Sequence, residues 1–158
     1  MKNSGIRNDT QFSVFLVNKP GILARVCQQL AQDKVNILAL SMMDSTEHGV
    51  LRFVAEDPQR ARDTLAVLDI PSTESQVLVT TMTNHPGALA DVVERLSVAH
   101  VNVNYAYCTA GAPGGKSLGV FRVSDLNKAV NVLSERKPRR KETPGPVRAN
   151  GRTRRNQT

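Results

Sequence analysis

Residues 18–24 read Asn-Lys-Pro-Gly-Ile-Leu-Ala, and residues 84–90 read Asn-His-Pro-Gly-Ala-Leu-Ala, so one short pattern occurs twice, 66 positions apart. The correspondence continues downstream at the pairs Val26/Val92, Leu30/Leu96, Val35/Val101 and Asn36/Asn102. A repeat that keeps a turn, a helix and the start of a strand in phase indicates a duplicated supersecondary unit. The sequence therefore predicts two copies of one small domain.

The segments around these turns alternate between strand and helix patterns. In each copy a strand ends at the Asn-x-Pro-Gly turn, and apolar residues then recur at helical spacing, as Leu23, Val26, Cys27 and Leu30 do. Two strand patterns and a second helix follow, the latter beginning at Asp57-Pro58 in the first copy. We interpret the long run 73–83 as the fourth strand of the first copy and the first strand of the second.

These patterns set the domain boundaries that we expect. Residues 1–10 read as a disordered lead-in, residues 11–76 as the first domain and residues 77–136 as the second. The sequence shows no pattern for a fourth strand in this second domain. The order strand-helix-strand-strand-helix-strand predicts a ferredoxin-like α+β unit, βαββαβ, with an antiparallel sheet and both helices on one face. Strand 2 then lies at an edge. We expect the two units to pair there as one eight-stranded sheet, and the chain to form a homodimer.

The charge lies at one end of the chain. Residues 1–136 carry 13 basic and 13 acidic side chains, whereas residues 137–158 carry eight basic ones against Glu142. The net charge of +7 therefore belongs to a tail that is expected to be disordered. Such a tail would attract nucleic acid at low salt but contains no base-reading element. We do not expect a nucleic-acid partner, and deletion of residues 138–158 would test that alternative.

Signals for chemistry are missing from the sequence. Cys27 and Cys108 form neither a disulfide framework nor a metal-binding spacing. We find no nucleophile–base pattern, phosphate loop or paired carboxylates, so we predict no enzyme, no cofactor and no metal. No apolar run reaches the ~20 residues of a membrane helix, and the N-terminus has no apolar leader. We therefore expect a cytoplasmic protein without membrane contact.

The Asn-x-Pro-Gly turn, the Leu-Ala-x-Val-x-x-x-Leu helix and the Val-Asn-Ile or Val-Asn-Val start of strand 2 resemble the ACT domain. The tandem arrangement resembles small stand-alone double-ACT proteins, and the likeness covers about residues 11–136. The resemblance implies a regulatory module that binds an amino acid at the interface between two ACT units. Some members that bind amino acids have a histidine two residues before the turn asparagine, where this chain has Leu16 and Met82.

Carried over to this sequence, the resemblance implies ligand contacts from both turns and from the asparagines that open strand 2. The candidate ligand-binding residues are Asn18, Lys19, Pro20, Gly21, Ile22, Leu23, Asn36, Asn84, His85, Pro86, Gly87, Ala88, Leu89 and Asn102. A helix N-terminus presents unpaired N–H groups suited to a carboxylate. The same residues could equally serve structure alone, with the asparagines capping or ending loops.

Two functions follow as hypotheses. The first is an amino-acid-binding sensor for allosteric regulation of amino-acid metabolism. The second is an interaction subunit that docks on a metabolic enzyme without a ligand of its own, as the small regulatory subunit of acetolactate synthase does. Ligand binding discriminates between the two.

Overall fold

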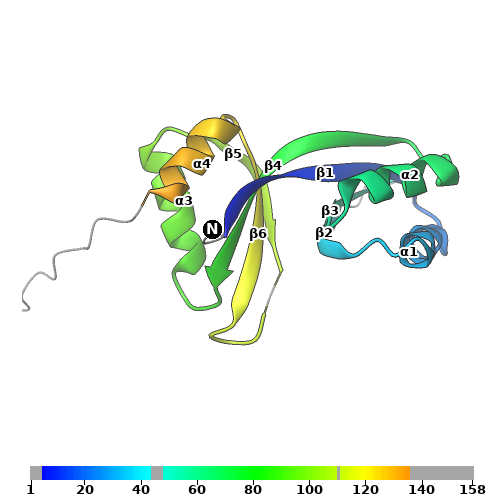
Figure 1. Ribbon diagram of the computed structural model, residues 1–158, viewed down its shortest axis with the longest axis horizontal. Coiled ribbons are helices and arrows are strands. Elements are labelled where there is room, and N and C mark those ends of the chain that lie inside the picture. The colour runs from blue at the N-terminus through cyan, green and yellow to red at the C-terminus, as the bar shows by residue number, and fades with distance from the viewer. Residues whose placement is uncertain (1–4, 44–47, 110, 136–158) are drawn as a thin grey trace, which may run out of the picture.

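The computed structural model describes residues 5–43, 48–109 and 111–135, which form an α+β protein (Figure 1). Within them the elements follow in this order: β1 (Ile6–Val17), α1 (Ile22–Gln32), β2 (Ile37–Met43), β3 (His48–Ala55), α2 (Pro58–Leu68), β4 (Ser72–Thr83), α3 (Ala88–Val98), β5 (Val103–Cys108), β6 (Lys116–Val123) and α4 (Leu126–Ser134). The expected basic tail, residues 137–158, lies outside the described residues.

The strands form one antiparallel sheet of six, in the order β2-β3-β1-β4-β6-β5. The expectation of eight strands was wrong, because the two units share their central pair. The second half of β1 and the first half of β4 belong to the first unit, which also holds β2, β3, α1 and α2. The other halves of β1 and β4 belong to the second unit with β5, β6, α3 and α4.

The start of β1 corrects a second expectation. Residues 6–10, which we took for part of a disordered lead-in, pair with β4 from Ile6 opposite Thr80 to Thr10 opposite Gln76. They supply the fourth strand of the second unit, for which the sequence showed no pattern. Thr10 and Gln76 occupy equivalent positions of the repeat and face each other, with a 3.1 Å hydrogen bond from Gln76 Nε2 to Thr10 Oγ1. A local two-fold relation between the units therefore passes between these two residues.

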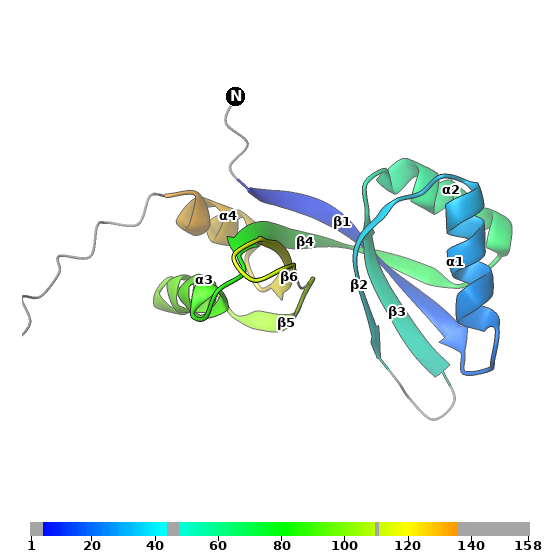
Figure 2. The ribbon, with the colours of Figure 1, turned by 90° about the horizontal axis from the view of Figure 1, so that it is seen from below.

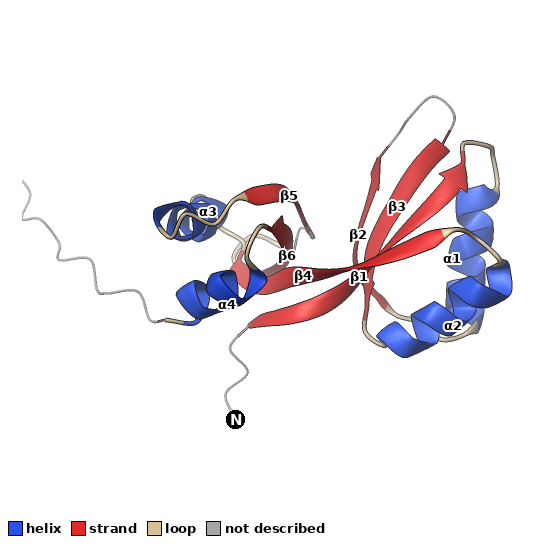
Figure 3. Ribbon diagram, turned by 90° about the horizontal axis from the view of Figure 1, so that it is seen from above, coloured by secondary structure: helices blue, strands red, loops and turns tan. Residues whose placement is uncertain are grey.

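Apolar side chains at helical and strand spacing build one core in each unit. Phe12, Val14 and Leu16 of β1 pack with Val26 and Leu30 of α1 and with α2 in the first core. In the second core, Leu78 and Phe121 pack with Leu96 of α3 and with α4, and Ile6 packs against this cluster. Ile6 and Phe12 are an even number of residues apart on β1, so their side chains point to the same face of the sheet. Both helix pairs therefore cover one face, as expected. Figure 3 shows α1 and α2 at one end and α3 and α4 at the other.

The helix-free face curls on itself. A third cluster joins Ala39 of β2 and Val54 of β3 to Val77 and Val79 of β4 and Val120 of β6, with Tyr107 of β5 packed against it. Because β2 and β5 are the two edges of the sheet, their contribution to one cluster requires strong curvature. Figure 2 shows β2 and β5 turned toward the same side of the β1–β4 pair. The predicted edge position of strand 2 is confirmed in both units.

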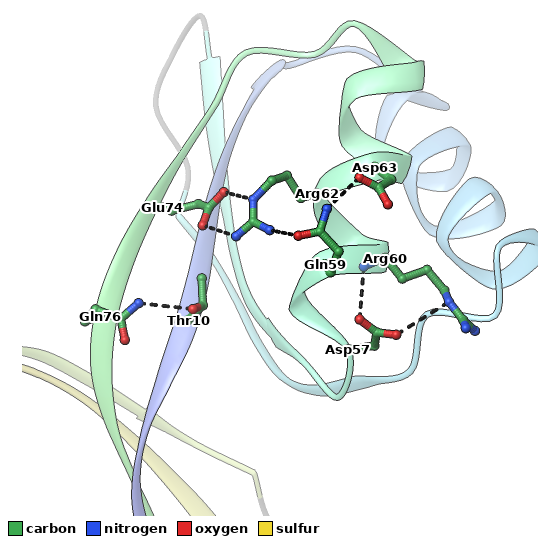
Figure 4. A network of polar contacts seen from close by, with 8 residues as sticks. All are labelled: Thr10, Asp57, Gln59, Arg60, Arg62, Asp63, Glu74 and Gln76. Atoms are coloured by element: carbon green, nitrogen blue, oxygen red, sulfur yellow. Dashed lines mark hydrogen bonds and ion pairs between the residues drawn. The ribbon is translucent and has the colours of Figure 1, made fainter.

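An ion pair ties α2 to β4 on the surface of the first unit. The Arg62 guanidinium donates two hydrogen bonds to the Glu74 carboxylate, at 2.6 and 2.7 Å, and a third to Gln59 Oε1 (Figure 4). The hydrogen bond from Arg62 lowers the pKa of Glu74 below its ordinary value. Both side chains are exposed, so water and salt screen the pair, and we assign it a role in orientation rather than a large share of stability.

Candidate functional site

The two Asn-x-Pro-Gly turns have the same backbone geometry. In the first, Lys19 N donates to Val17 O at 2.8 Å and Arg25 N donates to Gly21 O at 2.9 Å. In the second, His85 N donates to Thr83 O and Asp91 N donates to Gly87 O, both at 2.9 Å. The sequence repeat therefore corresponds to a repeated three-dimensional turn that leads into α1 and α3.

Glycine is required in both turns by the backbone angle. Gly21 has φ 89° and Gly87 has φ 91°, in the left-handed region that side chains other than glycine rarely adopt. A Cβ at either position would meet no atom within 4 Å, so the space beside each glycine is open. The requirement is therefore conformational, and each turn leaves its helix N-terminus approachable.

The four helices divide into two classes by how they begin. Asp57 and Asp125 cap α2 and α4 by accepting hydrogen bonds from the backbone N–H groups of Arg60 and Lys128. In contrast, Gly21 and Gly87 give α1 and α3 no side-chain cap. The helices that follow the repeated turns are thus the two whose first N–H groups donate to no capping side chain. Such an N-terminus favours a carboxylate through its N–H groups and the helix dipole.

The side chain of Asn84 holds the hairpin between β5 and β6 against the second turn. Its Nδ2 donates to Gly111 O at 2.6 Å and to Ala112 O at 3.3 Å. The backbone adds bonds from Asn84 N to Gly115 O and from Gly114 N to Asn84 O. The glycine-rich hairpin of residues 111–115 is therefore fastened to the turn. Asn84 serves structure here in addition to any ligand contact.

A pocket of about 200 Å³ opens beside the second turn. Its lining residues come from the end of β4, the turn, the start of α3 and the ends of β5 and β6: Met82, Thr83, Asn84, His85, Ala88, Leu89, Cys108, Thr109 and Ser117. Because β5 is an edge of the sheet, the pocket lies near an edge that no strand of the described chain covers. Four predicted site residues, Asn84, His85, Ala88 and Leu89, meet in this lining.

A second pocket, of about 310 Å³, adjoins the first beneath α3. It lies toward β1 and α4 and is lined by Gly5, Ile6, Thr80, Thr81, Met82, Thr83, His85, Ala88, Asp91, Val92, Arg95 and Leu133. Arg95 is committed to the end of α4, because its Nη2 donates to the carbonyl oxygens of Val132 and Glu135. The second turn therefore stands between two pockets that share Met82, Thr83, His85 and Ala88.

The strand-opening asparagines lie at the other end of their units. Asn36 Nδ2 donates to Glu56 Oε2 at 3.0 Å, and Asn102 O accepts from Ser124 N at 2.9 Å. β3 runs between the two ends of the first unit, since Val17 pairs with His48 and Ile37 pairs with Ala55. At about 3.3 Å per residue, this separates Asn36 from the first turn by roughly 20 Å. The lining of the two pockets includes neither Asn36 nor Asn102. Their role at a ligand stays a prediction that would need a neighbouring unit.

Several lining residues were not predicted from the sequence. Cys108, Thr109 and Ser117 come from β5 and β6, and Met82 was noted only as a departure from a histidine. The pairing of Met82 with Ser117 and of Cys108 with Gly119 brings these strand ends together. This register could not be read from the repeat alone. Burial raises the pKa of the Cys108 thiol above its ordinary value, so the thiol form prevails at neutral pH.

The two turns differ in charge. Lys19 and Arg25 accompany the first turn, and His85 and Asp91 take the equivalent places at the second. Among the described residues, no group of histidine, cysteine and acidic side chains is arranged to hold a metal ion. Within the same residues, no helix is both long and apolar enough to cross a bilayer.

The two βαββαβ units with their matching turns define a class of paired α+β domains. The model of the ACT domain pair matches residues 8–140, and the chain belongs to this family. The resemblance inferred from the sequence is thereby confirmed. A comparison with curated proteins found no match.

Solved structures support the assignment. Protein BT0572 from Bacteroides thetaiotaomicron is 32% identical, with a TM-score of 0.74 over 82% of this chain and 89% of that one. The ligand-free regulatory subunit of aspartate kinase from Thermus thermophilus is 15% identical, with a TM-score of 0.58 over 82% and 94%. Aspartokinase III of E. coli, solved in complex with lysine and aspartate, is 15% identical, with a TM-score of 0.51 over 81% and 31%. The last two likenesses concern the fold.

Proposed function

We propose that this protein is a non-catalytic, cytoplasmic sensor that binds a free amino acid and regulates amino-acid metabolism. The ligand would bind at the Asn-x-Pro-Gly turns, at an interface between ACT units. One observation carries the proposal: the second turn, whose glycine leaves α3 without a side-chain cap, opens onto a pocket of about 200 Å³. Pockets for drug-sized ligands are larger, about 300–1,000 Å³, so this one suits a single amino acid.

The groups around the turn match the two charges of an amino acid. The first N–H groups of α3 favour the carboxylate. Hydroxyl and carbonyl oxygens, including those of Thr83 and Thr109, can accept from the ammonium group. Asn36 and Asn102 would complete the site only if another unit brings them to the turns. A homodimer could do this by placing the uncovered β5 edge of one chain against a second chain.

The family and its relatives support a regulatory role. Regulatory subunits of aspartate kinase share the fold, and one aspartokinase with this fold was solved with lysine and aspartate. At 15% identity these likenesses do not transfer a ligand. Binding would regulate by shifting the protein toward the conformation that the ligand binds more tightly. The difference in affinity between the two conformations sets the size of this shift. The hairpin that Asn84 fastens to the turn connects the two strand ends, at Cys108 and Ser117, that line the pocket.

Calorimetric titration of the full chain with each of the twenty amino acids tests the proposal, and a thermal-shift assay with an external dye supports it. The chain contains no tryptophan, so intrinsic fluorescence is a poor readout. A ligand in the pocket should also slow alkylation of Cys108, which lines it, and leave Cys27 on α1 unaffected. If a folded sample binds none of the twenty, the sensor function is wrong.

The unpaired edge strand β2 favours a second candidate function, docking on a metabolic enzyme. Leu40, Met42 and Met43 of this strand are exposed at the edge of the sheet. An exposed apolar edge is suited to pairing with another chain. Affinity capture with the wild-type chain, against a Met42→Lys variant as control, tests this function. Recovery of a metabolic enzyme by the wild type alone would support it, and equal recovery by both would contradict it.

A further inference from the structure

The two units differ in how they fill the space beneath the helix that follows the turn. Ile22, the first residue of α1, packs against the core of the first unit. Its equivalent in the second unit is Ala88, which lines both pockets. A second equivalent pair replaces the buried Val14 by Thr80, a residue of similar size whose hydroxyl adds a polar group to the lining of the larger pocket. Replacing a large apolar side chain by a small one leaves space when its surroundings do not collapse.

We infer that the second unit of the chain holds a ligand site, and that this site takes an amino acid with an uncharged aliphatic side chain. This inference rests on the proposed function and narrows it. In the first unit Ile22 packs against the core, whereas its equivalent Ala88 lines both pockets of the second unit. The inference thus depends on the small size of Ala88.

The lining of the 200 Å³ pocket determines the class of side chain. Met82, Ala88 and Leu89 give it apolar walls, and its polar members are neutral hydroxyl, amide, thiol and imidazole groups. Its lining contains no Asp, Glu, Lys or Arg. A charged ligand side chain would lose its hydration there without gaining an ion partner, which is costly. A short aliphatic side chain loses little hydration and gains contacts.

The adjoining pocket is the place where a charged side chain would have to go. It contains Asp91 and Arg95, but the Arg95 guanidinium already donates to two carbonyl oxygens at the end of α4. We therefore place the amino-acid head group at the turn, near Gly87 and Leu89, and its side chain past Ala88 in the smaller pocket. A ligand that instead used Asp91 would be a basic amino acid.

The variant Ala88→Ile transfers the first unit's residue to the second unit and tests the inference. The probes are valine, leucine, isoleucine, lysine, arginine, aspartate and glutamate, titrated calorimetrically into the full chain. We expect the wild type to bind one or more aliphatic probes and none of the charged ones. In Ala88→Ile the affinity should fall about tenfold or more, since single methylene groups in a filled pocket produce changes of that size. The unliganded melting temperature should not fall.

The matched control is Ile22→Ala, the reverse exchange in the first unit, which should keep the wild-type affinity although it lowers stability. If Ala88→Ile fails to fold by circular dichroism, Ala88→Val takes its place. Unchanged affinity in a folded Ala88 variant, or lost affinity in Ile22→Ala, would overturn the placement in the second unit. Binding of lysine or arginine that Asp91→Asn abolishes would overturn the aliphatic class and leave the sensor function standing. If none of the twenty amino acids binds, the sensor function itself falls.

Discussion

The side-chain amide of Gln11 donates a hydrogen bond to the hydroxyl of Tyr105 across the helix-free face of the sheet, at 2.7 Å. Gln11 is fully buried on β1, and its Oε1 accepts from the Tyr107 hydroxyl at 3.0 Å. The Arg52 guanidinium lies 4.6 Å from the centre of the Tyr105 ring. These contacts join the first unit to the edge strand β5 of the second and hold the curl of the sheet.

Replacing Gln11 should therefore weaken the whole fold. Gln11→Met keeps the length of the side chain but removes the partners of both tyrosine hydroxyls, and we expect a loss of about 1–3 kcal/mol in the free energy of unfolding. Urea denaturation measures this loss. In a double-mutant cycle with Tyr107→Phe, the two losses should be less than additive, because both variants break the same bond. Fully additive losses would contradict the coupling.

Ionisation of the Tyr107 hydroxyl should lower the stability of the fold at alkaline pH. Burial raises the pKa of Tyr107 above its ordinary value, with a smaller contribution from Tyr105 and an opposing one from Arg52. Because the folded state holds this proton more tightly, the stabilisation is complete below pH ~10, the pKa of an unfolded tyrosine, and is lost as the pH rises toward the folded pKa. Urea midpoints between pH 8 and 11 should fall less steeply in Tyr107→Phe than in the wild type. Parallel pH profiles would rule out this role for Tyr107.

Removal of residues 1–10 should damage the second unit, at the far end of the sequence. The deletion takes away the strand that pairs with β4 and the Ile6 side chain that packs on the second core. We expect the amides of α3 and α4 to lose protection against hydrogen exchange. Deletion of residues 2–4 is the matched control, because it spares that strand. If α3 and α4 keep their protection in the longer deletion, the shared-strand arrangement is wrong.

Gly21→Ala and Gly87→Ala should each destabilise the protein through the backbone alone. An alanine at these positive φ angles costs about 1–2 kcal/mol, and its Cβ would meet no neighbour within 4 Å. Because the two turns share one geometry, the two losses in urea denaturation should be similar. A loss at one turn only would show that the turns are not conformationally equivalent.

The Asn84→Ala variant should release the β5–β6 hairpin. It removes the donor to the carbonyl oxygens of Gly111 and Ala112, which lie in residues 111–115. We expect faster hydrogen exchange there, read by mass spectrometry, with β1 unchanged. Asn18→Ala, the equivalent change in the first unit, is the control and should leave residues 111–115 as protected as in the wild type. An unchanged hairpin in Asn84→Ala would contradict this role.

The repeat predicted much of the fold, and it could have predicted more. Local patterns predicted that a helix begins at Pro58 and that the run shared by both units, which is β4 in the structure, is a strand. The start of β1 was missed because residues 7–10 are all polar, so no apolar alternation indicated a strand. Shifted by 66 positions, however, these residues correspond to the equally polar start of β4, which we did read as a strand. The strand count failed for the same reason, since two strands serve both units.

The candidate site was harder to predict. The turns and their glycines followed from the repeated pattern, and their matching geometry agrees with it. The pocket was not predicted, because it depends on the register between β4, β5 and β6 and on the smaller side chain of Ala88 relative to Ile22. A sequence pattern identifies the residues that are present, whereas a cavity arises from missing volume. Only the packed structure shows that the second turn adjoins such a space.

The exchange of strand halves between β1 and β4 has a consequence for the origin of the chain. Before the duplication, a half-length polypeptide could have completed its sheet only by lending one strand segment to a second molecule and borrowing the same segment in return. Such a precursor would have been an obligate pair of identical subunits, with its rotation axis where Thr10 and Gln76 now meet. Fusing the two genes would have turned that assembly into a single polypeptide and freed each copy to diverge, as Ile22 on the first core and Ala88 beside a pocket now differ.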